Sequence, residues 1–182
     1  SPLNARVQSD DLAKDVKVTA GSSATIDGQP AGTLDVNLTA SGLLDSAGKI
    51  KPGMPGQLAG RASLRGVATA IAQPFINLTE IDLPRDIGPT LDVELVAGAD
   101  AKSDSQRVDV TATAEKLNIA GTLERTPQKV GLLGDGLRIE AASAGSIASR
   151  FVKPETGWRL SSAAGQGAAG GRTVILVKTL NI

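Results

Sequence analysis

The sequence predicts a mainly β protein: an antiparallel meander that forms an open curved sheet or a sandwich, with two short helices. Three observations support this prediction. Short aliphatic runs alternate with polar residues, residues typical of turns separate the runs, and one strand pattern occurs twice. The two copies of that pattern, residues 33–40 (TLDVNLTA) and 90–97 (TLDVELVA), are identical at six of eight positions.

Strands are expected where apolar residues recur at every second position, because successive side chains of a strand point to opposite faces of the sheet. The runs predict eight to ten strands. In chain order they are Val16 and Val18; Leu34, Val36 and Leu38; Leu58, Ala62 and Leu64; Leu91, Val93 and Leu95; Val108 and Val110; Leu117, Ile119 and Leu123; Leu137 and Ile139; and Thr173–Val177.

Turn residues fall between these runs, as an antiparallel meander requires. They occur at Asp27–Gly28, Ala47–Gly48, Pro52–Gly53, Pro55–Gly56 and Gly134–Gly136, and in the polar segment Asp100–Ser105.

Two segments have the three- and four-residue apolar spacing of a helix instead. The first prediction is a helix over Gly66–Phe75, which a proline ends. The second is a helix over Ser143–Val152, with Ser143 or Ser146 as its N-cap and Pro154 as its stop. We expect these helices to cover an end or a face of the sheet.

The helices form a second candidate repeat, since each follows a Leu-Arg pair and contains a Phe near its end. Phe75 and Phe151 lie about 76 residues apart, whereas Thr33 and Thr90 lie 57 apart. The unequal spacings disfavour a strictly periodic solenoid, and chance similarity is an open alternative for both pairs. The chain is interpreted as one elongated domain, or as two related units at about 1–80 and 81–182.

Composition excludes several classes of function. Nineteen basic residues balance nineteen acidic ones and only 2% of residues are aromatic, so the chain has neither the charge nor the stacking groups of a nucleic-acid-binding protein. It contains no Cys and no His, which removes thiol chemistry, Ser-His-Asp catalysis and most zinc sites. No apolar run is long enough for a transmembrane helix. The chain starts with neither Met nor a signal-peptide pattern, so we expect a piece of a longer protein.

No catalytic, cofactor-binding or metal-binding residue is predicted. The string Gly165–Gly170 matches the G-x-G-x-x-G pattern of dinucleotide sites, but a strand pattern rather than a helix follows it, which favours a hairpin loop. The acidic residues with the strongest claim to chemistry alternate with apolar neighbours, which places them on the solvated face of predicted strands. They are Asp35, Asp92, Glu94, Asp109 and Glu140. A hydrolase that uses a carboxylate pair is the remaining enzymatic alternative.

A region that spans mainly Leu58 to Glu140 resembles parts of large bacterial envelope proteins of the AsmA and TamB type. The likeness lies in residues 88–93 (GPTLDV), 108–114 (VDVTATA) and 136–142 (GLRIEAA), and in the strand, short helix and Pro-Phe run at Gly66–Phe75. The resemblance implies an elongated periplasmic protein with an amino-terminal anchoring helix. It also implies a curved β-sheet that carries lipid acyl chains between the inner and outer membranes.

The resemblance thus implies a non-enzymatic role in lipid trafficking or outer-membrane assembly, with acyl chains and neighbouring repeats of the parent protein as partners. The side chains expected to face acyl chains are Leu34, Val36, Leu38, Leu91, Val93 and Leu95. An aliphatic face can bury acyl chains, but for most of these positions the favoured interpretation is an ordinary core, in which the same face packs on a second sheet or on the helices. A structural or adhesive β-module of a secreted or cell-surface protein is the alternative function.

Overall fold

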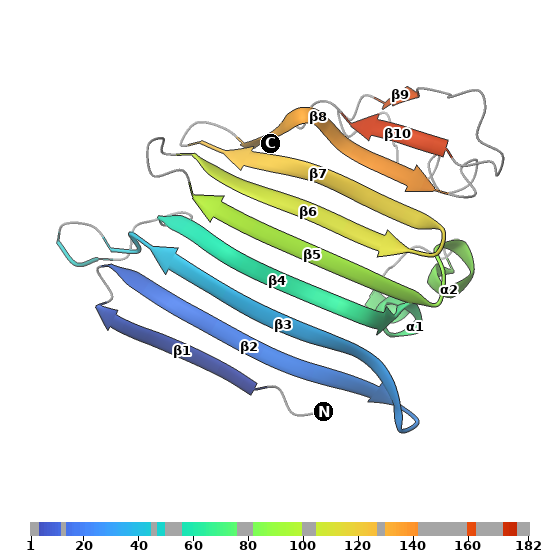
Figure 1. Cartoon of the computed structure of the whole chain (residues 1–182), viewed down its shortest axis with the longest axis horizontal. Helices are drawn as coiled ribbons and strands as arrows, with labels where there is room; N and C mark the ends of the chain where they lie inside the picture. The colour runs from blue at the N-terminus through green and yellow to red at the C-terminus, as the bar shows by residue number, and fades with distance from the viewer. Residues whose placement is uncertain are drawn as a thin grey trace.

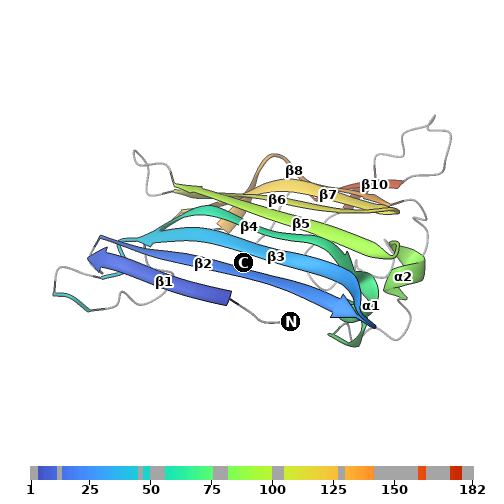
Figure 2. The same ribbon diagram turned by 60° about the horizontal axis from the view of Figure 1, so that its bottom comes forward.

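A computed structural model describes residues 4–11, 14–44, 47–49, 56–75, 82–99, 105–126, 130–141, 160–162 and 173–177. It confirms the mainly β class. Ten strands form one antiparallel sheet in the order β1-β2-β3-β4-β5-β6-β7-β8-β10-β9, so that the chain meanders through its first eight strands (Figure 1). In the described part of the chain this sheet is open and single-layered, and no second sheet faces it (Figure 2).

The elements have the following bounds. The strands are β1 (Asn4–Asp11), β2 (Asp15–Ile26), β3 (Gln29–Ser41), β4 (Gln57–Ala68), β5 (Thr90–Ala99), β6 (Gln106–Ala114), β7 (Leu117–Arg125), β8 (Val130–Ala141), β9 (Leu160–Ser162) and β10 (Thr173–Val177). The helices are α1 (Thr69–Ala72), the 3-10 turn η1 (Gln73–Phe75) and α2 (Leu83–Asp86).

The predicted helix over Gly66–Phe75 is right in its second half and wrong in its first. Residues up to Ala68 belong to β4, where Val67 pairs with Leu91 of β5, and the helix begins at Thr69. Strand pairing with β5 therefore overrides the local helical spacing. The second predicted helix, Ser143–Val152, lies outside the described residues, as do Pro52–Gly53, Pro55, Asp100–Asp104 and Gly165–Gly170.

The turn predicted at Gly134–Gly136 is also wrong, because this segment lies inside β8. The pairing register between β7 and β8 shifts there, between Ala120 and Thr122, and Gly134 and Gly136 have φ angles of 62° and 89°. Glycine supplies the left-handed backbone that such a β-bulge uses. The turn predicted at Asp27–Gly28 is confirmed between β2 and β3.

Two elements had only weak signals in the sequence. β1 contains a single large aliphatic residue, Val7, among polar neighbours. α2 has only four residues, but Asp82 caps it by accepting a hydrogen bond from the Arg85 amide (3.1 Å), and Pro84 stands in its first turn.

The repeated strand pattern occupies β3 and β5, which lie on either side of β4 and run in the same direction. The two copies are offset from each other along the strand direction. Leu34 pairs with Leu64, whereas its counterpart Leu91 pairs with Val67, beyond a register shift in β4. At that shift the Gly66 amide donates a hydrogen bond to Asp92 Oδ1 (2.5 Å). The two similar segments therefore lie in the same sheet on either side of β4, offset along the strand direction.

Candidate binding surface

The register of the sheet gathers the aliphatic side chains on one face, which we call the apolar face. Residues paired across antiparallel strands lie on the same face, so the pairs can be followed from strand to strand. Three rows cross most of the sheet. They are Val18, Leu38, Gly60, Ala97, Val108, Leu123 and Leu132; Ala20, Val36, Ala62, Leu95, Val110 and Gly121; and Leu34, Leu64, Val93, Ala112, Ile119 and Ile139.

All six residues expected from the resemblance lie on the apolar face. Five belong to the three rows, and Leu91 lies in the next row with Val67 and Ala114. The structure thus brings these side chains, which come from β3 and β5, onto one surface. The rows also include equivalent positions from β2, β4, β6, β7 and β8, so the surface is larger than the two similar strands indicated.

Side chains of the apolar face are only partly buried. Along β6, Val108, Val110 and Ala112 are half-buried, whereas Asp109 and Thr111 between them are exposed. Leu64 and Leu95, in the centre of the sheet, keep 37% and 39% of their surface exposed. The described apolar residues that are fully buried are few: Ala31, Leu83, Ile87, Ala97, Ala141 and Val177. Within the described residues, the apolar face is therefore not the core of a sandwich.

One end of the apolar face is closed by the connection between β4 and β5, which forms α1 and α2 (Figure 1). Leu83 and Ile87 of this connection are buried and pack with Ala72 and with Ala114 and Leu117, where β6 and β7 meet. The predicted role of the first helix, covering an end of the sheet, is thereby confirmed. The rest of the described face receives no such cover.

Hydrogen bonds hold this connection in place. The side chain of Thr69, only 1% exposed, donates from its hydroxyl to the carbonyl oxygen of Gly88 (2.7 Å), and its amide donates to that of Pro89 (3.0 Å). The Leu83 amide donates to Gln73 Oε1 (2.7 Å), and the Lys116 amide donates to the Ile87 carbonyl (2.9 Å). These hydrogen bonds therefore join the beginning of the connection to its end, and the end of α2 to the β6–β7 turn.

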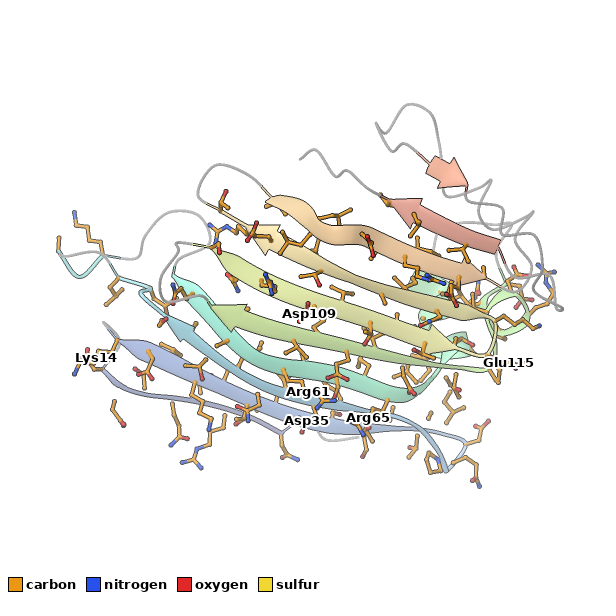
Figure 3. The ribbon with its side chains drawn as sticks, turned by 45° about the horizontal axis from the view of Figure 1, so that its top comes forward. Lys14, Asp35, Arg61, Arg65, Asp109 and Glu115 are labelled. Atoms are coloured by element: carbon orange, nitrogen blue, oxygen red, sulfur yellow. The ribbon has the colours of Figure 1, made fainter. Side chains whose placement is uncertain are left out.

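The opposite face of the sheet, which we call the polar face, carries charged, hydroxyl and amide side chains from every strand between β1 and β8. In Figure 3, Asp35 of β3, Arg61 and Arg65 of β4 and Asp109 of β6 are drawn on it. The five acidic residues singled out in the sequence all lie on this face, as their alternation predicted.

Four of these five carboxylates have a partner within the protein. Glu94 Oε1 lies 2.6 Å from Arg61 Nε, and Glu140 Oε1 lies 2.6 Å from Arg138 Nη2. Asp109 Oδ1 accepts a hydrogen bond from the Thr122 hydroxyl (2.6 Å), and Asp92 accepts the one from the Gly66 amide. The described residues contain no group of three or more Asp or Glu side chains placed to hold a metal ion. Three of these interactions join neighbouring strands, and the Glu140–Arg138 ion pair lies within β8.

The polar face is hollowed in places. A depression of about 540 Å³ lies over β1–β3, and Arg6, Thr19, Asp35 and Asn37 are among its lining residues. Another, of about 310 Å³, lies over β4–β6, and its lining residues include Arg65, Asp92, Glu94 and Thr113. Both are open to solvent and lined by polar groups, so they suit hydrated polar ligands better than an apolar one.

No protein-family model, curated protein or solved structure matches this chain. Among the described residues, no helix has the length and apolar character needed to cross a membrane.

Proposed function

We propose that this chain is a non-enzymatic segment of a periplasmic envelope protein, and that its apolar face carries acyl chains in lipid trafficking or outer-membrane assembly. One observation supports the proposal most directly. Three aliphatic rows cross the sheet in register, and in the described part of the chain helices cover only one end of them. Continuous exposed apolar surfaces mark sites of interaction with proteins, membranes or apolar ligands.

The composition of the surface favours an acyl chain among these partners. The rows consist of Leu, Ile, Val, Ala and Gly, which attract apolar groups without directional hydrogen bonds. Protein interfaces, by contrast, are enriched in Tyr, Trp, Phe, Met and Arg. None of those residues occurs in the three rows.

The dimensions of the surface also fit. The longest of the three rows runs from Val18 in β2 to Leu132 in β8, across seven neighbouring strands. At about 4.8 Å between strands, the six intervals span roughly 29 Å. An acyl chain in a bilayer occupies about half of a hydrocarbon core of roughly 30 Å, so a complete chain fits along the row. One-sided contact covers about half of each methylene and contributes about 0.4 kcal/mol per group.

The direct test is to purify the chain from the periplasm of a Gram-negative host and to analyse it by native mass spectrometry and lipid extraction. The proposal predicts protein molecules that carry phospholipid or fatty acid, and release of that lipid in organic solvent. Protein that is free of lipid, and that binds no added fluorescent fatty acid, would contradict it.

A structural or adhesive β-module is the second candidate, and the depressions on the polar face support it. Their carboxylates, amides and hydroxyls are groups that hydrogen-bond polar ligands such as glycans. A glycan array distinguishes the two functions. Glycan binding by lipid-free protein, lost on Asp35→Ala and retained in Leu95→Ala, would favour the adhesive function.

A further inference from the structure

The edge of the sheet at β1 is open. In the described part of the chain, β1 pairs with β2 on one side only, and all eight of its residues are exposed. Val7 keeps 67% of its surface exposed, more than any other large hydrophobic residue that the structure describes. An edge strand presents unpaired backbone N–H and C=O groups, to which another strand can be added.

The first part of β1 has a regular geometry that suits such pairing. Residues from Asn4 to Gln8 pair one to one with β2, and the register shift comes later, between Gln8 and Asp11. Proteins usually protect edge strands with charged side chains, especially lysine, with proline or with a bulge. The segment from Asn4 to Gln8 contains no proline, lysine or bulge and a single charged residue, Arg6, whereas the far end of β1 has both the irregularity and two acidic residues, Asp10 and Asp11.

The structure favours β1 of a second copy as the added strand. At the other edge of the described sheet, β9 has three residues, whereas β1 has eight. Pairing of β1 with β9 of another copy would therefore join at most three residues, but pairing of β1 with β1 can be longer. Two identical strands that pair antiparallel are related by a two-fold axis, which closes the assembly as a dimer.

The side chains of β1 select one register for this pairing. Val7 lies on the apolar face opposite Val18, whereas Arg6 and Gln8 lie on the polar face. A register that centres on Arg6 places two like charges opposite each other, which destabilises a strand pair. A register that centres on Gln8 reaches further into the irregular end of β1, because it places Ala5 opposite Asp11, whereas centring on Val7 places Ala5 opposite Ser9. Centring on Val7 places Val7 against Val7 of the second copy and Arg6 against Gln8, and it keeps each face continuous.

We therefore propose that β1 is a dimerisation edge, at which a second copy of this chain adds its own β1 antiparallel with the two Val7 residues opposite each other. Pairing satisfies the exposed backbone groups and covers the most exposed aliphatic side chain. It also joins the apolar faces of the two copies into one surface. This inference does not depend on lipid binding.

A cysteine placed at Val7 tests the register, because the chain contains no other cysteine. Opposed residues in an antiparallel pair have Cα atoms about 4.5–5.5 Å apart, within the roughly 4.4–6.8 Å that a disulfide requires. Val7→Cys should therefore form a disulfide-linked dimer under mild oxidation. Gln8→Cys is the matched control. Its two copies would lie about 8 Å apart, beyond disulfide range, and should cross-link at least tenfold more slowly.

Sedimentation equilibrium tests the association itself. A single strand pair is a small interface, so we expect a dissociation constant between about 1 μM and 1 mM. With any affinity tag placed at the carboxyl end, the mass should rise from 18.4 kDa towards twice that value as the concentration approaches about 1 mM. Val7→Lys should keep the protein monomeric, whereas Val96→Lys, an exposed position inside the sheet, should leave association unchanged.

The proposal requires all of these results together. A mass that stays at 18.4 kDa, equal cross-linking of the two cysteine variants, or association that survives Val7→Lys would each overturn it. Thermal unfolding followed by circular dichroism checks that the variants are folded. We expect the Val7 variants to fold normally, because the Val7 side chain is largely exposed.

Discussion

Leu95 and Val96 offer a matched test of the proposed function, because they are adjacent in β5, are both 39% exposed and point to opposite faces of the sheet. If acyl chains bind the apolar face, Leu95→Asp should weaken their binding and Val96→Asp should not. Similar exposure of the two side chains means that both substitutions should affect folding to a similar, limited extent. The comparison therefore separates ligand binding from stability.

The size of the effect follows from the exposed area. Full burial of a leucine side chain contributes about 1.5–3 kcal/mol, so covering the remaining 39% contributes about 0.6–1.2 kcal/mol. Leu95→Ala should therefore lower affinity about three- to eightfold. An aspartate would also have to be desolvated, at a cost of about 2 kcal/mol or more. The total of roughly 3 kcal/mol corresponds to about a hundredfold loss for Leu95→Asp.

Fluorescence titration with a labelled fatty acid measures these affinities, and thermal unfolding followed by circular dichroism measures the accompanying change in stability. We expect the order wild type, then Val96→Asp close to it, then Leu95→Ala, then Leu95→Asp. Equal losses in the two aspartate variants would show that binding does not distinguish the faces. Unchanged affinity in Leu95→Asp would refute acyl-chain binding at the centre of the apolar face.

Two further predictions concern stability, and thermal unfolding checks both at about 2–4 °C per kcal/mol for a chain of this length. Gly60→Ala should lower the free energy of unfolding by about 1–3 kcal/mol, because φ is +129° and the new Cβ would overlap a backbone oxygen of β3. Gly98→Ala, with nothing near its Cβ position, should be neutral or stabilising; equal losses would contradict the packing argument. Thr69→Val should cost about 1–2 kcal/mol, because the buried carbonyl of Gly88 loses its hydroxyl donor. Exposed Thr111→Val should change stability by less than about 0.5 kcal/mol, and a similar loss in both would refute this role for the hydroxyl.

Alternation along the strands was sufficient to predict the β class, most strands and the faces on which Leu95 and Asp109 lie. This works because a strand has a period of two, so the polarity of neighbouring residues reports which side of the sheet each one occupies. The same reasoning placed Asp92 on the polar face. It did not predict that Asp92 accepts the Gly66 amide, because that bond depends on the register shift between β4 and β5.

Local patterns were misleading where pairing partners decided the structure. The helical spacing from Gly66 onwards yielded to pairing of β4 with β5, and the glycines at Gly134–Gly136 form a bulge in β8 rather than a turn. Both outcomes depend on how one strand pairs with the next strand of the sheet, which the local pattern of residues does not specify. The open edge at β1 was missed for the related reason that one valine among polar residues gives too weak an alternation to predict a strand.

The sequence by itself determined the chemical character of the two faces, since each strand carries its own alternation of aliphatic and polar residues. Only the tertiary structure decided that the strands form a single open sheet, in which the described apolar face is covered at one end by α1 and α2. The physical reason is that alternation describes one strand and its two sides. Whether a second layer covers an apolar side depends on how the strands connect and pair, which no single strand encodes.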